Sequence, residues 1–221
     1  MTRRLLPLLL VLAVAACEPA PPTGAAPAAP PATSPPAASP LAPETTTAAP
    51  AATPASAYRV TYPWGVPSRP ARTVHPLVAP PLPFLARVQV GDHPTADPPY
   101  TRITFAFEGG WPTYEIAYQR DVPAEGTGDP IPLPGNSFLR ISFIEATGHD
   151  DTGRTTARPA SWLGFPTLRG YGFGGDFEGH VTYGLGIQAA PASDQAWPIR
   201  VGELVRADGT HVVAVDVRRG G

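Results

Sequence analysis

The chain of 221 residues contains no lysine and a single cysteine. All of its basic residues are therefore arginines, which excludes Schiff-base catalysis and phosphate-binding loops that depend on a lysine. Cys17 alone cannot form a disulfide within the chain, and sites with several thiolate ligands are excluded as well. No basic block is present either. The 16 arginines face 18 acidic residues, for a formal net charge of −2, so no nucleic-acid partner is expected.

The N-terminus, MTRRLLPLLLVLAVAAC, joins two arginines to an apolar run that ends at Cys17. This run of about 12 residues is shorter than the ~20 that cross a bilayer, but it suits a secretion signal. Val14-Ala15-Ala16-Cys17 resembles the lipobox of bacterial lipoproteins. We therefore predict a signal peptide at residues 1–16, a lipid on Cys17 and an anchor on the extracytoplasmic face of the cell membrane. A plain signal peptide with a chance cysteine is the alternative.

Two proline-rich segments follow. Residues 17–57 consist almost entirely of Ala, Pro, Thr and Ser. Such a segment has too little apolar surface to offset its ordering entropy, so we predict a disordered linker that holds a folded domain away from the membrane. Residues 58–84 are still proline-rich but carry aromatic side chains. We expect an extended arm whose rings pack on the domain, namely Tyr58, Tyr62, Trp64 and Phe84.

Beyond the arm, apolar and polar residues alternate with the period of β-strands, and no helical period is sustained. The segment 136–146 is apolar on much of both faces, so we place it centrally. Asp208-Gly209 favours a hairpin with a primed turn, in which both central residues have positive φ. The predicted fold is an all-β antiparallel sandwich of about seven strands. These strands are residues 85–90, 101–108, 113–119, 136–146, 179–188, 199–206 and 210–219.

Residues 170–175, GYGFGG, satisfy the GxGxxG pattern of dinucleotide-binding loops. That chemistry needs a helix after the pattern, because the helix N-terminus holds the pyrophosphate. Here a predicted strand follows instead. We therefore predict a flexible loop bearing Tyr171 and Phe173, at the end of a long insertion-like loop over residues 147–175.

Two short groups of Asp and His could supply metal ligands. They are Asp92-His93 with Asp97, and His149-Asp150-Asp151. Neither group has the spacing of a zinc protease or of an EF-hand, and these residues are common turn formers. No metal and no cofactor is predicted.

Aromatic residues at a predicted hairpin tip and in a predicted loop are the candidate ligand contacts. Trp111 lies at the tip of the hairpin TFAFEGGWPTYEI, where it could stack on a sugar ring, dock a partner, or fold back over the end of the sandwich. Tyr171 and Phe173 are the other candidates. Asp176 and Glu178 could instead act as acid and base of a glycan hydrolase, because two residues at i and i+2 of a strand share a face.

Several segments together resemble the AMIN-like domain of actinobacterial lipoproteins, which is related to the AMIN domain of cell-wall amidases and secretins. They are His93 with Arg102-Ile103-Thr104-Phe105, Glu178-Gly179 with Gly184-Leu185-Gly186, and the strand from Val213 to Val217. The resemblance implies a β-sandwich over residues 85–221 that binds or localises in the cell envelope, with cell-wall glycan or an envelope protein as partner. It implies no catalysis, so a glycan hydrolase is only the alternative.

Overall fold

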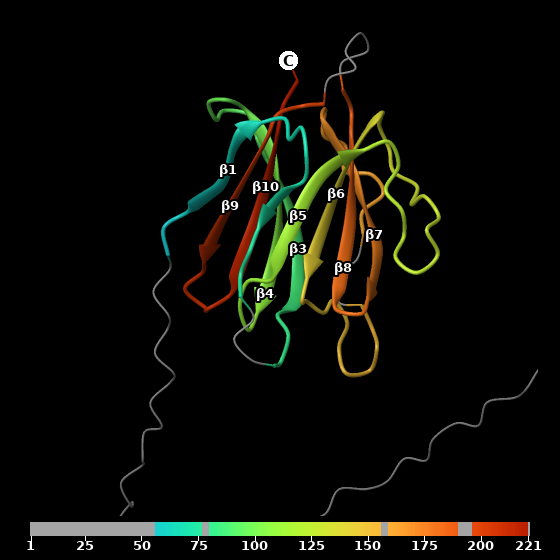
Figure 1. Ribbon diagram of the computed structural model, residues 1–221. Helices are drawn as coiled ribbons and strands as arrows, with labels where there is room; N and C mark the ends of the chain where they lie inside the picture. The colour runs from blue at the N-terminus through green and yellow to red at the C-terminus, as the bar shows by residue number, and fades with distance from the viewer. Residues whose placement is uncertain (1–55, 77–79, 156–158, 190–195, 221) are drawn as a thin grey trace, which may run out of the picture. The chain divides into compact units, whose positions relative to one another are not determined.

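The computed structural model describes residues 56–76, 80–155, 159–189 and 196–220, which form ten strands with antiparallel pairing. Two five-stranded sheets face each other (Figure 1). The first has the order β1 (Arg59–Gly65), β9 (Ile199–Val205), β10 (His211–Arg218), β4 (Tyr100–Glu108) and β3 (Phe84–His93). The second has the order β2 (Ala71–Thr73), β5 (Thr113–Gln119), β6 (Ser137–Ile144), β8 (His180–Ile187) and β7 (Leu168–Phe177). The predicted signal peptide, Cys17 and the linker up to residue 55 lie outside the described residues.

The predicted all-β sandwich is confirmed, but the number of about seven strands is too low. The three additional strands are β1 and β2, in the segment predicted as an arm, and β7, in the segment predicted as a loop. Prolines interrupt β1 and the approach to β2. In β7, glycines at positions 170, 172 and 174 hide the alternation that normally marks a strand. The GxGxxG segment is therefore an edge strand paired with β8 and not a flexible loop.

Residues that alternate along the strands form one core between the sheets. Ile103, Phe105 and Phe107 of β4 are fully buried, as their shared face predicts. Phe105 lies 4.9 Å from Phe143 of β6 and 5.2 Å from Tyr183 of β8, measured between ring centroids. β6 is the middle strand of its sheet, which confirms the central position predicted for the segment 136–146.

Two hairpin turns differ in type. The hairpin between β9 and β10 is present, but only Gly209 has a positive φ, of 83°, and its N–H donates to the carbonyl of Arg206 at 2.9 Å. The prediction of a primed turn there is therefore wrong, because such a turn needs two residues with positive φ. A turn with two positive φ values joins β7 to β8 instead, through Glu178 (50°) and Gly179 (77°).

Candidate functional site

A glycine-lined face of the second sheet positions the first candidate site. In β8, Gly184 and Gly186 alternate with the core residues Tyr183 and Leu185, so they point away from the core. The chain segment 121–136, called the covering loop here, packs directly on them. A Cβ on Gly186 would lie 2.1 Å from the carbonyl oxygen of Pro134. The glycines of this region therefore let the backbone of the covering loop approach β8 closely, and this packing explains them without a bound phosphate.

The covering loop and β7 enclose a hollow of about 270 Å³, called the edge hollow here. Tyr171 and Phe173 both line it, opposite Ile131 and Pro132 of the covering loop. Tyr171 is buried, with 6% of its surface exposed, and Phe173 is half-buried with its ring 5.4 Å from that of Tyr183. The structure thus brings two of the three predicted aromatic contacts together. Most of the Tyr171 ring is nevertheless engaged in the core.

Trp162 is exposed, adjoins the lining of the edge hollow in the chain, and was not among the predicted contacts. It follows Ser161, which lines the hollow, in a segment held to β7 by two backbone hydrogen bonds. The Trp162 side chain is 61% exposed, and the Arg169 guanidinium carbon lies 4.4 Å from its ring centroid. An isolated tryptophan between prolines and glycines, outside any alternating run, was the available signal in the sequence. Because Arg169 covers one face of the ring, the exposed area lies on its other side and edges.

Trp111 folds back over the end of the sandwich. Its ring stacks on His75 at 5.5 Å and meets the ring of His211 edge-on at 4.6 Å, and its Nε1–H donates to the carbonyl of Val212 at 3.4 Å. The side chain keeps partial exposure. Of the arrangements considered for Trp111, the structure has the one that closes the sandwich. A ligand contact through its exposed part stays a prediction.

At the same end, a hollow of about 530 Å³ lies between the β4–β5 turn and residues 147–151. His149 lines this end hollow, and its Nδ1 is hydrogen-bonded to Oδ2 of Asp176. The same carboxylate oxygen accepts the N–H of Gly148 at 2.7 Å, and the Asp176 side chain is only 8% exposed. β7 ends at Phe177, which places Glu178 in the turn and exposes it. Asp176 and Glu178 are therefore not two carboxylates on one strand face, and the partner of Asp176 is a histidine.

The profile of the AMIN-like domain matches residues 83–219, well over half of the chain. The protein belongs to the AMIN-like domain family. No curated protein and no solved structure matches the chain significantly. The matched range of the AMIN-like domain contains the edge hollow, Trp162 and most of the residues that line the end hollow, of which Pro81 and Leu82 precede it. It begins after β2, so the two strands β1 and β2 complete the sheets from outside it.

A buried carboxylate joins these two strands to the AMIN-like domain. Glu203 of β9 is 1% exposed and accepts hydrogen bonds from the Tyr114 hydroxyl at 2.8 Å and from Arg59. Its Oε1 also lies 2.7 Å from Nε2 of His75. Burial raises the pKa of Tyr114, which therefore stays protonated and donates to the carboxylate. Glu203 thus links β1, through Arg59, and the segment just after β2, through His75, to Tyr114 of the second sheet.

Asp92 and Asp150, two of the acidic residues considered as metal ligands, have other partners. Asp92 accepts from the Thr101 hydroxyl at 2.9 Å and pairs with Arg219 at 3.3 Å. Asp150 organises its own turn, and hydrogen bonds led by that from Thr152 lower its pKa to about 2. In the part of the chain that the structure describes, no three His, Cys, Asp or Glu residues are grouped to hold a metal. Within the same residues, no helix has the length and apolar character needed to cross a membrane.

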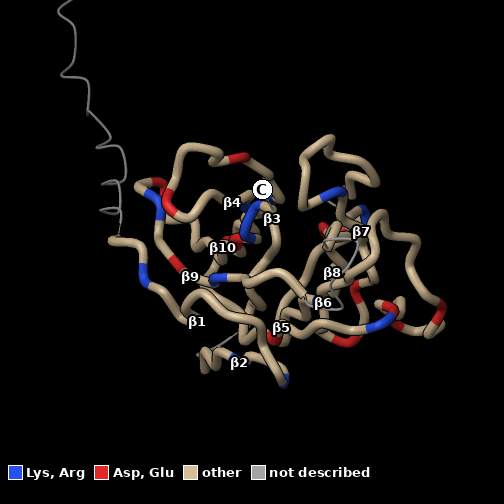
Figure 2. The backbone as a smooth tube through the Cα atoms, turned by 90° about the horizontal axis from the view of Figure 1, so that it is seen from above, with Lys and Arg blue, Asp and Glu red and all other residues tan. Residues whose placement is uncertain are grey.

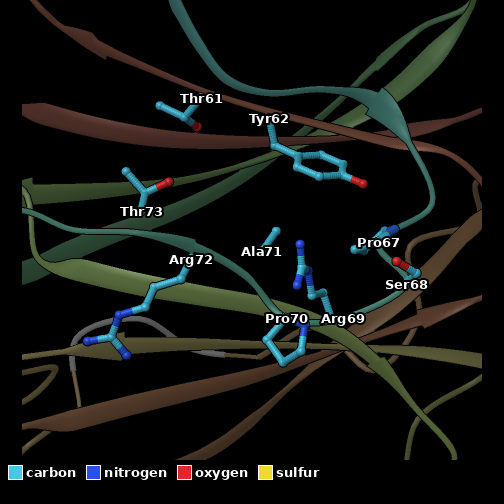
Figure 3. A pocket seen from close by; sticks show the side chains of 9 residues that line it. All are labelled: Thr61, Tyr62, Pro67, Ser68, Arg69, Pro70, Ala71, Arg72 and Thr73. Atoms are coloured by element: carbon cyan, nitrogen blue, oxygen red, sulfur yellow. The ribbon is translucent and has the colours of Figure 1, made fainter.

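A third hollow, of about 210 Å³, is formed by β1, β2 and the turn between them, and we call it the turn hollow (Figure 3). It lies outside the matched range of the AMIN-like domain. Around both sheets, arginines and acidic residues are interspersed (Figure 2). The turn hollow differs from this mixed pattern, because its lining includes Arg69 and Arg72 but no acidic residue.

Proposed function

We propose that this AMIN-like domain is a non-catalytic binding module of the bacterial cell envelope that contacts cell-wall glycan through Trp162 and the edge hollow. One observation carries the proposal. A tryptophan with 61% of its surface exposed directly follows, in the chain, a residue that lines a hollow with two aromatic side chains in its wall. Flat aromatic faces pack against the apolar faces of sugar rings, and exposed tryptophans are frequent anchors of binding surfaces. The family membership supports a place in the envelope.

The supporting contacts favour a preformed surface. Tyr171 N–H donates to the Ala160 carbonyl at 2.8 Å, and Leu163 N–H donates to the Arg169 carbonyl at 2.7 Å. These bonds fix the backbone on both sides of Trp162. A ring held in this way loses little conformational entropy when a ligand stacks on it. The proposed anchor on Cys17 would keep the module at the outer face of the membrane.

Co-sedimentation with isolated cell-wall sacculi tests the proposal. We expect saturable binding that Trp162→Ala weakens at least tenfold, since loss of one central aromatic anchor removes about 1.4 kcal/mol or more. Phe177→Ala is the matched control, because Phe177 is 55% exposed but lies in the β7–β8 hairpin away from the edge hollow. Equal loss in both variants, or binding no better than that of an unrelated β-sandwich, would contradict the assignment. In the latter case, crosslinking would be expected to recover a specific envelope protein.

A glycan hydrolase remains the second candidate, and the Asp176–His149 pair beside the end hollow is the observation that favours it. A carboxylate that orients an imidazole is a common arrangement in general-base catalysis. The non-catalytic proposal predicts that sacculi incubated with the protein release no soluble fragments detectable by mass spectrometry. Release that Asp176→Asn abolishes would overturn it. Glu178→Gln then tells whether the exposed turn carboxylate takes part.

A further inference from the structure

The turn hollow has a charge that nothing in the described structure neutralises. Arg72 points away from the hollow and pairs with Glu115 of β5 (Figure 3). Arg69 extends into the hollow between Tyr62 and Ala71 (Figure 3), and among the described residues it takes part in no ion pair. A guanidinium presents its donors in a planar fork that fits the oxygens of a phosphate or a carboxylate.

Two residues with hydroxyl groups line the same hollow as this guanidinium. Ser68 and Tyr62 both line the turn hollow, and neither hydroxyl is hydrogen-bonded to another described residue. The hydroxyl of Thr61 is different, because it lies 2.9 Å from the Tyr114 hydroxyl and belongs to the Glu203 cluster. The hollow thus offers a guanidinium and two further donors. Three donor groups suit the several oxygens of a phosphate better than the two oxygens of a carboxylate.

Two prolines restrict the backbone of the turn that carries Ser68 and Arg69. Pro67 and Pro70 bracket Ser68 and Arg69 and fix two of the backbone dihedral angles. The hydrogen-bonded pairing of β1 with β9 and of β2 with β5 holds both ends of the turn. Little order therefore has to be gained when a ligand binds.

We propose that the turn hollow is a phosphate-binding site, with Arg69 as the principal contact and Ser68 and Tyr62 as supporting donors. The phosphate belongs either to a phosphodiester polymer of the cell wall or to a lipid headgroup. Both are anionic groups within reach of an envelope module. The site lies outside the matched family range and is independent of glycan binding at Trp162.

NMR titration of the protein with inorganic phosphate and with a glycerophosphodiester tests the site. We expect saturable shifts of the amides of the non-proline residues between 66 and 72, with weaker effects from acetate. Arg69→Gln should reduce the affinity at least tenfold, equivalent to about 1.4 kcal/mol. Arg72→Gln is the matched control, because it removes the same charge from the strand next to the turn. It should change the affinity less than about twofold, since Arg72 is paired with Glu115. Absence of saturable shifts, or equal loss in both variants, would overturn the proposal.

Two further experiments distinguish a lipid headgroup from a wall polymer as the source of the phosphate. Arg69-dependent flotation with phosphatidylglycerol vesicles would assign the site to a lipid headgroup. Arg69-dependent sedimentation with sacculi, lost when phosphodiester polymers are stripped from them by acid, would assign it to a wall polymer. If Arg69 matters in neither experiment, the hollow binds an adventitious ion only and the proposal fails. Trp162→Ala is carried through both experiments, so that failure of the glycan site is recognised separately.

Discussion

Asp216 on β10 is fully buried between two guanidinium groups on the outer side of the first sheet. Arg102 donates to both of its carboxylate oxygens at 2.6 and 2.9 Å, and Arg200 donates twice to Oδ2 at 2.9 and 2.6 Å. The hydrogen bond to Asp216 raises the pKa of Arg102. The ring centroid of Tyr100 lies 5.2 Å from the guanidinium carbon of Arg102 and 5.2 Å from that of Arg200. The two arginines therefore have aromatic as well as acidic contacts.

Asp216→Asn should therefore destabilise the fold by roughly 2–3 kcal/mol, because the amide presents donors to donors and leaves two guanidiniums unpaired. The loss stays below that of a fully buried pair, since the arginine side chains are 22% and 23% exposed. Glu115→Gln, at the exposed pair with Arg72, is the control and should cost less than about 1 kcal/mol. Urea unfolding measures both. Equal effects would mean that burial of Asp216 adds nothing to its pairing.

His211 makes the stability depend on pH. Burial lowers the pKa of His211, nearby His75 lowers it further, and a backbone hydrogen bond with Gly209 acts in the opposite direction. The unfolded chain therefore binds a proton more readily than the folded chain just below the ordinary histidine pKa of ~6.5. The free energy of unfolding should fall as the pH drops through this region.

We expect His211→Gln to reduce the loss of stability between about pH 7.5 and 5.5, because the variant has no proton to bind there. The exposed His180→Gln serves as the control and should leave that loss unchanged. An NMR titration in which His211 keeps an ordinary or raised pKa would contradict the argument.

Among the elements, β7 and the covering loop depend on each other. β7 and β8 present glycines outward, and the covering loop fills the space that side chains would occupy. Glu125 of this loop accepts hydrogen bonds from Thr182 of β8 and Arg140 of β6, both at 2.7 Å. The loop is therefore held to three strands of the sheet by packing and by charge, and it forms one wall of the edge hollow.

Gly186→Ala should displace the covering loop, because its Cβ would lie 2.1 Å from a backbone oxygen that no side-chain rotation can move. We expect a loss of about 3 kcal/mol on urea unfolding and faster proteolysis within residues 121–136. Gly91→Ala on β3 is the control, since its nearest neighbouring atom would be 3.8 Å away, and it should change stability by less than about 0.5 kcal/mol. Unchanged proteolysis in Gly186→Ala would show that the loop is not seated on these glycines.

At the scale of the whole molecule, the β-sandwich consists of the range matched by the AMIN-like family together with strands β1 and β2, which precede that range. Both of these strands lie at sheet edges, on the same side of the sandwich (Figure 2). The proposed tether enters the domain through them. Ser56, just before β1, already exchanges hydrogen bonds with Val205 of β9, at 2.9 Å through its backbone and 2.6 Å through its hydroxyl. The last two residues of the segment predicted as linker, 56 and 57, are therefore among the described residues, and Ser56 is bonded to the first sheet.

Cys17→Ala should release the protein from the membrane fraction without changing its fold, because the mature chain would lose its proposed lipid. Metabolic labelling with a radioactive fatty acid should mark the native chain and not the variant. The control for the fold is thermal unfolding of the native protein, extracted with detergent, and of the Cys17→Ala variant. A variant that stays in the membrane fraction without label would point to another means of attachment.

The all-β class followed from local alternation, because burial on one face of a strand leaves a period of two in neighbouring residues. The central position of β6 followed from apolar residues on both of its faces. The three further strands did not follow, since prolines and glycines hide that period and their pairing partners are distant. β1, for example, pairs with β9 across more than a hundred residues. AMIN-like membership was accessible from strand patterns, and the profile match confirms it.

The sites were decided by tertiary contacts. Glu203 and Asp216 read as ordinary polar positions in strands, and only packing from other strands makes them buried and paired. Tyr171 and Phe173 were named as aromatic residues of a predicted loop, yet Tyr171 packs in the core, whereas Trp162 is exposed. Periodicity reports which residues share a face of one element. Exposure and unpaired charge depend on which distant segments cover that face, and this information is carried by the three-dimensional packing alone.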